Sequence, residues 1–121
     1  GSLYHNEELN FMLELPLDWC GKYSVRADNS GVGFFQQNGL AEHPACMFYV
    51  NRWESQVTPE EIEASGNIFL MQNGGRVYEL ELPQEAPYTG DEPEEVLREW
   101  EMMRGYVQSI ADSAQPIVKY E

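Results

Sequence analysis

Positively charged residues are scarce in this chain of 121 residues. It holds seven Lys and Arg against 21 Asp and Glu, which gives a formal net charge of −14 at pH 7. Nucleic-acid binding depends on Lys and Arg that displace counterions from phosphates, and anionic lipid headgroups attract basic segments. The sequence therefore predicts that the protein binds neither nucleic acid nor an anionic membrane surface.

Motifs for catalysis and for metal binding are lacking too. There is no G-x-G-x-x-G, P-loop, G-x-S-x-G or H-E-x-x-H pattern, and only two histidines occur, His5 and His43. His43 and Cys46 have a spacing that suits two metal ligands, but a closed zinc site needs four ligands and there is no second Cys/His pair. We expect no catalytic residue set, no metal and no cofactor.

Long hydrophobic runs are missing as well. No stretch approaches the ~20 apolar residues of a transmembrane helix, so no direct membrane insertion is expected. Gly1-Ser2 resembles the scar of a cleaved expression tag, which leaves residues 3–121 as a single domain. This interpretation predicts that a native leader or a lipid-anchoring cysteine preceded the domain.

Cysteine is limited to Cys20 and Cys46, and two alternatives are open for them. A disulfide would close a loop of about 25 residues and stabilise the fold by about 3.5 kcal/mol. The other alternative is a pair of reduced thiols that pack as small hydrophobes.

What the sequence does contain is a series of strand patterns. In the first, Phe11, Leu13 and Leu15 share one face, Pro16 ends the strand, and Trp19 can fold back over that face. Further strands, separated by turn sequences, are expected at residues 22–27, 31–37, 46–52, 67–72 and 76–82.

The strand at 46–52 is apolar on both alternating faces. Met47 and Tyr49 are expected on one face, opposite Cys46, Phe48 and Val50 on the other. This pattern predicts a central strand that is covered on each side.

Two helices are expected. Thr58, Pro59 and Glu61 have the arrangement of a capping box at the start of a short helix. A long helix over residues 91–114 begins with a second such box, Asp91 and Glu94. Its apolar positions recur at helical spacing: Val96, Trp100, Met103, Val107, Ile110 and Ala114. The elements together predict an α+β domain, with an antiparallel sheet of about six strands flanked by helices and the long C-terminal helix packed on the sheet.

Acidic residues are concentrated in the second half, where residues 60–101 hold twelve acids and two arginines. This excess favours a basic protein or peptide as partner, and a merely solubilising surface is the alternative. The candidate interaction surface consists of Glu79, Glu81, Asp91, Glu92, Glu94 and Glu95. Aromatic residues near element ends offer a stacking platform unless they pack into the core: Trp53, Tyr88 and Tyr120.

The opening Phe11-Met-Leu-Glu-Leu-Pro16 with Trp19, followed by the Asn73-Gly-Gly75 hairpin and a terminal helix, resembles the Mog1/PsbP-like group of domains. It also resembles small domains of uncharacterised secreted lipoproteins from Gram-positive gut bacteria. The resemblance implies an antiparallel sheet between helices and an extracytoplasmic location, secreted or lipid-anchored. No calcium, manganese or GTPase-binding residue is carried over. A cystatin-like curved sheet on a helix is the alternative fold, although it usually places the long helix before the sheet.

The sequence thus favours a non-enzymatic extracytoplasmic binding or interaction module. The competing class is a carboxylate-based hydrolase, because paired acids are plentiful in this chain. A compact cleft with two converging carboxylates would favour the hydrolase, and a broad acidic or aromatic surface would favour the binding module.

Overall fold

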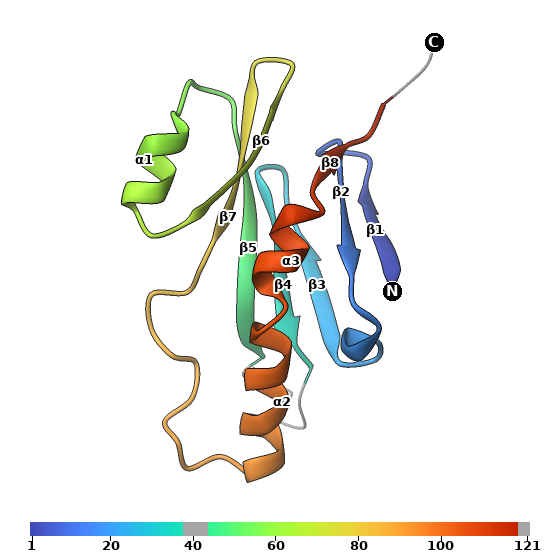
Figure 1. The fold of residues 1–121 in the computed structure, drawn as a ribbon, viewed down its shortest axis with the longest axis vertical. Coiled ribbons are helices and arrows are strands. Elements are labelled where there is room, and N and C mark those ends of the chain that lie inside the picture. Colours follow the sequence, from blue (N-terminus) through green and yellow to red (C-terminus); the bar gives the residue numbers. More distant parts are fainter. Residues whose placement is uncertain (38–43, 119–121) are drawn as a thin grey trace.

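Two antiparallel sheets and a bent C-terminal helix make up the fold (Figure 1). A computed structural model of the chain describes residues 1–37 and 44–118. It confirms the expected α+β class, with the strands divided between a three-stranded and a five-stranded sheet in place of one sheet of about six. The elements in chain order are β1 (Ser2–Asn6), β2 (Phe11–Leu15), the 3-10 helix η1 (Leu17–Trp19), β3 (Tyr23–Ala27), β4 (Gly31–Gln36), β5 (Ala45–Trp53), α1 (Pro59–Ala64), β6 (Ile68–Asn73), β7 (Arg76–Glu81), α2 (Glu94–Arg104), α3 (Val107–Asp112) and β8 (Gln115–Pro116).

The small sheet has β2 at its centre, between β1 and β8. Strand β2 confirms the predicted alternation, since Phe11, Leu13 and Leu15 are buried while Glu14 is exposed. Its apolar face is therefore the part of this sheet that enters the core.

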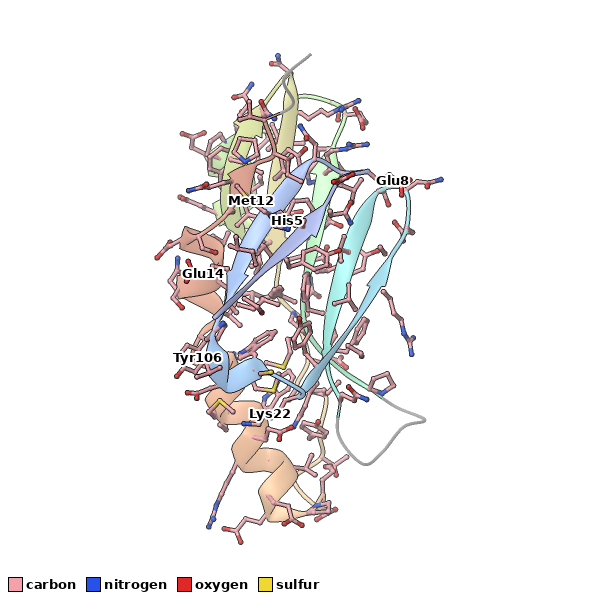
Figure 2. The ribbon with its side chains drawn as sticks, turned by 90° about the vertical axis from the view of Figure 1, so that its right-hand side faces the viewer. His5, Glu8, Met12, Glu14, Lys22 and Tyr106 are labelled. Carbon is pink, nitrogen blue, oxygen red and sulfur yellow. The ribbon has the colours of Figure 1, made fainter. Side chains whose placement is uncertain are left out.

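Strand β1 was not predicted from the sequence. It pairs with β2 along its whole length, from Ser2 opposite Leu15 to Asn6 opposite Phe11. Figure 2 shows the solvent side of this hairpin, with His5, Met12 and Glu14 on the face that points away from the core.

The large sheet has the strand order β3-β4-β5-β7-β6 and is antiparallel throughout. Val50 on β5 lies opposite Leu80 on β7, and both side chains are fully buried in the core. Because side chains alternate along a strand, the residues on either side of this pair point to the opposite face of the sheet.

A bulge in β5 changes which of its residues face the core. Phe34 pairs with Phe48, whereas Phe35 pairs with Cys46, so Met47 is the extra residue. Met47 and Phe48 are both buried in the core, and Cys46 is half-buried. The predicted alternation, with Met47 opposite Cys46 and Phe48, was wrong because the inserted residue reverses the faces on its N-terminal side.

The short helix α1 begins as predicted. The Thr58 side chain accepts a hydrogen bond from the backbone N–H of Glu61, and the Glu61 carboxylate accepts one from the backbone N–H of Thr58. Both contacts satisfy N–H groups that have no partner within the helix.

The C-terminal helix is bent, with Gly105 and Tyr106 between α2 and α3. Its predicted start at Asp91 was wrong: Pro93 is the N-cap residue, and no side chain caps this end. The apolar stripe is confirmed in both helices, with Trp100, Met103, Val107 and Ile110 buried and Val96 and Ala114 partly buried.

The core lies between one face of the large sheet and a layer formed by the small sheet and the bent helix. Trp19 joins these parts: its ring is stacked 6.0 Å from that of Phe48 on β5, and its indole N–H donates to the carbonyl of Met103 on α2. Rings of the two sheets also meet, with Tyr4 on β1 5.0 Å from Phe34 on β4.

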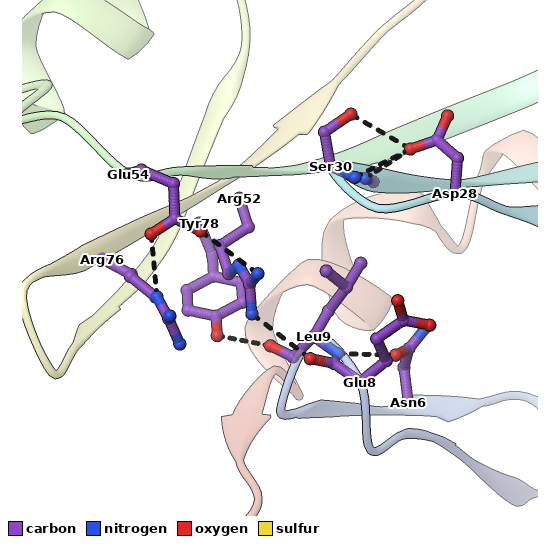
Figure 3. Close-up of polar contacts among 10 residues, drawn as sticks. Asn6, Glu8, Leu9, Asp28, Ser30, Arg52, Glu54, Arg76 and Tyr78 are labelled. Carbon is purple, nitrogen blue, oxygen red and sulfur yellow. Dashed lines mark hydrogen bonds and ion pairs between the residues drawn. The ribbon is translucent and has the colours of Figure 1, made fainter.

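Polar contacts fasten the turn between β1 and β2 to the large sheet (Figure 3). The Tyr78 hydroxyl donates to the Leu9 carbonyl at 2.5 Å, and Arg52 Nη1 donates to the Glu8 carbonyl at 3.3 Å. Arg52 also pairs with Glu54, at 3.1 Å. These contacts hold the small sheet over the inner face of the large sheet, so the opposite face is where exposed functional side chains can gather.

Candidate functional site

The outer sheet face, as we call the face of the large sheet turned away from the core, combines aromatic rings with carboxylates. Its positions follow from the pairs Tyr49–Glu81 and Asn51–Glu79, which flank the buried pair of β5 and β7. The residues of the outer sheet face are Arg26, Phe35, Cys46, Tyr49, Asn51, Trp53, Glu79 and Glu81.

Aromatic rings lie across β4 because two glycines leave room for them. A Cβ atom at Gly31 would be 2.4 Å from the Tyr49 ring, and one at Gly33 would be 2.8 Å from the Phe35 ring and 3.1 Å from the Tyr49 ring. The Arg26 guanidinium carbon is 5.2 Å from the centroid of the Phe35 ring, which is a cation–π contact. Strand β4 therefore supports an aromatic floor, and one of its rings already holds a cation of this chain.

Glu79 is the centre of a hydrogen-bond cluster on the outer sheet face. It is only 5% exposed. Its Oε1 accepts from Trp53 Nε1 at 3.1 Å and from Asn51 Nδ2 at 3.2 Å, and its Oε2 accepts from Asn67 Nδ2 at 3.1 Å. All three donors are neutral, and no Lys or Arg of residues 1–37 and 44–118 forms an ion pair with it. The cluster positions Trp53 and Asn51 without cancelling the formal charge of the carboxylate.

Glu81 is exposed and borders an open hollow of about 400 Å³. Asn51 Nδ2 donates to Glu81 Oε1 at 2.7 Å as well as to Glu79, so one amide bridges the two carboxylates. The residues that line the hollow are Cys46, Tyr49, Asn51, Glu81, Leu82 and Pro83.

Tyr49 is held in place by Asp28, which precedes β4. The Tyr49 hydroxyl donates to Asp28 Oδ2 at 2.8 Å. Hydrogen bonds from the backbone of Ser30, from Tyr49, from the Ser30 side chain and from the backbone of Gly31 lower the pKa of Asp28 to about 2. The hydrogen bond to Asp28, with slight burial and nearby negative charges, raises the pKa of Tyr49. At neutral pH Asp28 is thus negative and Tyr49 is neutral.

Cys46 forms part of the hollow as a neutral thiol. Burial, and to a smaller extent the charge of Glu81, raises the pKa of Cys46 above its ordinary value of 9.0. A thiol is a nucleophile only as the thiolate, so Cys46 is poorly suited to nucleophilic catalysis.

The two cysteines of the expected disulfide are both free thiols in this structure. Cys46 lies on the outer sheet face, a consequence of the β5 bulge, while the exposed Cys20 follows η1 on the other side of the sheet. The disulfide stays a prediction, and its test is given in the Discussion.

The six acids of the predicted interaction surface fall into two groups. Glu79 and Glu81 lie together on β7, whereas the remaining four belong to the end of the loop 82–93 and the start of α2, which Figure 1 places at the far end of the helix from α3. There Asp91 and Glu95 are exposed, and Glu94 pairs with Arg98. The sequence could not show this separation because both groups are close along the chain.

Glu92 has a local structural role in the second group. Its carboxylate accepts hydrogen bonds from the backbone N–H groups of Thr89, at 2.7 Å, and Gly90, at 3.1 Å. Burial acts to raise the pKa of Glu92, but these hydrogen bonds and that of the Thr89 side chain outweigh it, and the pKa is lowered. The carboxylate closes the turn that leads into α2.

Two other predicted features have different outcomes. His43 of the H-x-x-C spacing and Tyr120 of the aromatic platform lie outside the described residues. Trp53 is on the outer sheet face and is 40% exposed, whereas Tyr88 packs edge-on against Trp100 with the ring centroids 5.6 Å apart. Residues 1–37 and 44–118 contain no group of three or more His, Cys, Asp or Glu side chains that could hold a metal ion.

Sequence reasoning missed the neutral residues that organise this site: Tyr49, Asn51 and Asn67. One signal was present, the alternation Gly31-Val-Gly33 in a predicted strand, because glycine in a strand indicates a close approach by another group. The partners of that approach depend on the register between β4 and β5, which the sequence alone does not determine.

Comparisons with known proteins identify no relative: no family model matches the chain, and no curated protein or solved structure matches it. The fold and site therefore define the class of protein, an α+β domain with one covered and one open face of its main sheet. In the part of the chain that the structure describes, no helix is long and apolar enough to cross a membrane.

Proposed function

We propose that this domain is a non-enzymatic binding module whose outer sheet face receives a basic segment of a partner protein or peptide. The observation that carries the proposal is the Asn51 bridge between Glu79 and Glu81. Neutral donors orient both carboxylates, and their formal charge is left without a cation among the described residues. A basic group of a partner would supply the charge that this face lacks.

Exposed rings on the same face support a peptide as the ligand. Trp53 is 40% exposed, and Glu79 fixes its indole N–H. Aromatic residues are frequent among those that contribute most to protein interfaces, and Lys and Arg side chains bind well to ring faces. A basic segment could thus use both the carboxylates and the rings.

The test is the binding of pentaarginine, measured by calorimetry and by amide chemical shifts. We expect the shifts to map to the outer sheet face and the affinity to fall as salt rises, because exposed charges beyond the Debye length, about 8 Å at physiological ionic strength, are screened. Perturbations spread evenly over the acidic surface would contradict the proposal.

Two matched double variants separate the site from the net charge. Glu79→Gln with Glu81→Gln and Glu94→Gln with Glu95→Gln remove the same charge at different places. The proposal expects weaker binding only in the first, with folding checked by circular dichroism. An equal loss in both would show that the overall charge attracts pentaarginine and that the outer sheet face does not select it.

A carboxylate-based hydrolase is the second candidate, favoured by the fact that one amide nitrogen contacts both Glu79 and Glu81. Against it, Glu79 is 5% exposed and accepts three hydrogen bonds, which leaves a substrate little access. Chromogenic glycosides and esters are suitable substrates for a screen. Turnover that Glu81→Gln abolishes would replace the binding module with the enzyme.

We also propose an extracytoplasmic location, secreted or lipid-anchored. The support is the resemblance of the Phe11–Trp19 opening to that of secreted lipoprotein domains. Fractionation of cells that carry the native gene, followed by immunoblotting, tests this part. Protein confined to the cytoplasmic fraction would refute it.

A further inference from the structure

The hollow beside Glu81 has the chemistry of a pocket for a single side chain. Leu82 and Pro83 contribute apolar wall, and Cys46 contributes a thiol that burial and Glu81 keep neutral. Among the residues that line it, Glu81 alone carries a formal charge. Long basic side chains have an apolar stem and a charged end, and this division matches apolar walls with one carboxylate.

The aromatic part of the hollow favours a planar cation. Tyr49 spans Gly31 and Gly33 and is held by Asp28, so its ring needs little reorganisation on binding. A guanidinium stacks on an aromatic ring and can also donate two parallel hydrogen bonds to one carboxylate, which an ammonium cannot do. Glu81 Oε2 accepts no hydrogen bond from residues 1–37 and 44–118, so it is open to such a donor.

The neighbouring ring gives an example of this contact within the chain. Arg26 places its guanidinium 5.2 Å from the centroid of the Phe35 ring, which lies against Gly33 beside Tyr49. No described cation of this chain occupies the corresponding place over Tyr49. The two rings are supported in the same way, but only the one next to Glu81 is open to a partner.

We infer that this hollow binds one arginine side chain of the partner, with its guanidinium on the Tyr49 ring and against the Glu81 carboxylate. The inference rests on the proposed function and names the group that the outer sheet face recognises. Because charge and shape are both read, an uncharged side chain of the same shape is rejected.

The experiment compares three small ligands by amide chemical-shift titration of the whole chain: acetyl-argininamide, acetyl-citrullinamide and acetyl-lysinamide. Citrulline keeps the length and planarity of arginine but has no charge. We expect the arginine ligand to move the amides of Cys46, Tyr49 and Leu82, and to bind at least about tenfold more tightly than the citrulline ligand, the effect of one charge-assisted hydrogen bond. The lysine ligand should be intermediate.

Glu81→Gln is the decisive variant, with Glu95→Gln as a control that removes one exposed acid elsewhere. We expect Glu81→Gln to abolish the preference for arginine over citrulline and Glu95→Gln to preserve it. Equal binding of arginine and citrulline, equal binding of arginine and lysine, or shifts outside the hollow would each overturn the inference. Pentaarginine bound to the outer sheet face with its affinity unchanged by Glu81→Gln would overturn this inference alone, whereas pentaarginine that fails to bind this face would overturn the proposed function.

Discussion

The indole Nε1 of Trp19 donates a 3.1 Å hydrogen bond to the backbone carbonyl of Met103, 84 residues further along the chain. The same carbonyl accepts the backbone N–H of Tyr106 at the bend between α2 and α3. Trp19 thus connects the turn after β2 to the point where the C-terminal helix changes direction. This contact gives the tryptophan of the opening sequence a structural role.

Replacing Trp19 with Phe should destabilise the fold beyond the loss of ring volume. The missing indole N–H should cost about 1 to 3 kcal/mol of unfolding free energy, because the bond it makes is buried. Trp100→Phe is the matched control: it loses the same part of the ring, but the described contacts of its indole include no hydrogen bond. Urea unfolding measures both, and equal losses would contradict the role given to the Trp19–Met103 bond.

The parts of the fold that were predicted are those that repeat along a single element. The alternation of Phe11, Leu13 and Leu15 and the stripe from Val96 to Ala114 were recognised because each reports on burial of one face. Strand β1 was missed since its sequence has no comparable apolar face, and the helix bend was missed because the stripe runs through it.

The site was less predictable because it depends on contacts between strands. Glu79 and Glu81 were selected as acids of one strand face, which the structure confirms, but Asn51 and Tyr49 join them only through the register of β5 with β7. The bulge at Met47 then places Cys46 beside Tyr49. A bulge has no residue pattern of its own in this chain, so its effect on the hollow could not be anticipated.

Glu79→Gln should weaken the cluster that fixes Trp53. An amide has one acceptor oxygen, so its nitrogen would face a donor that the carboxylate now satisfies, at a cost of about 1 to 3 kcal/mol. Glu81→Gln, at an exposed position, should change the unfolding free energy by less than about 0.5 kcal/mol. Urea unfolding and tryptophan fluorescence follow both effects, and similar values for the two variants would show that the cluster contributes little.

Asp28 should make the fold sensitive to acid in a defined range. Its pKa is about 2 in the folded chain against an ordinary value of 3.8, so its stabilising effect is complete above pH 3.8 and is lost as the pH falls towards 2. Over this range the urea midpoint of the natural sequence should fall more steeply than that of Asp28→Asn. Carbon-13 titration of the Asp28 carboxyl supplies the direct measurement, and Tyr49→Phe should move its midpoint upward. A midpoint near 3.8 in the natural sequence would contradict the hydrogen bonds assigned to Asp28.

The two cysteines should differ in their rates of alkylation. Cys20 is exposed, whereas Cys46 is half-buried with a raised pKa, so iodoacetamide should label Cys20 first and Cys46 slowly at pH 8. In a Cys20→Ser background, Glu81→Gln should speed the labelling of Cys46, because the charge of Glu81 is one cause of the raised pKa. Intact mass of the unreduced protein decides the redox form: a mass lower by two hydrogens, with no label taken up, would establish the Cys20–Cys46 disulfide. Two labels acquired in sequence would establish free thiols and leave Cys46 as a neutral wall of the hollow.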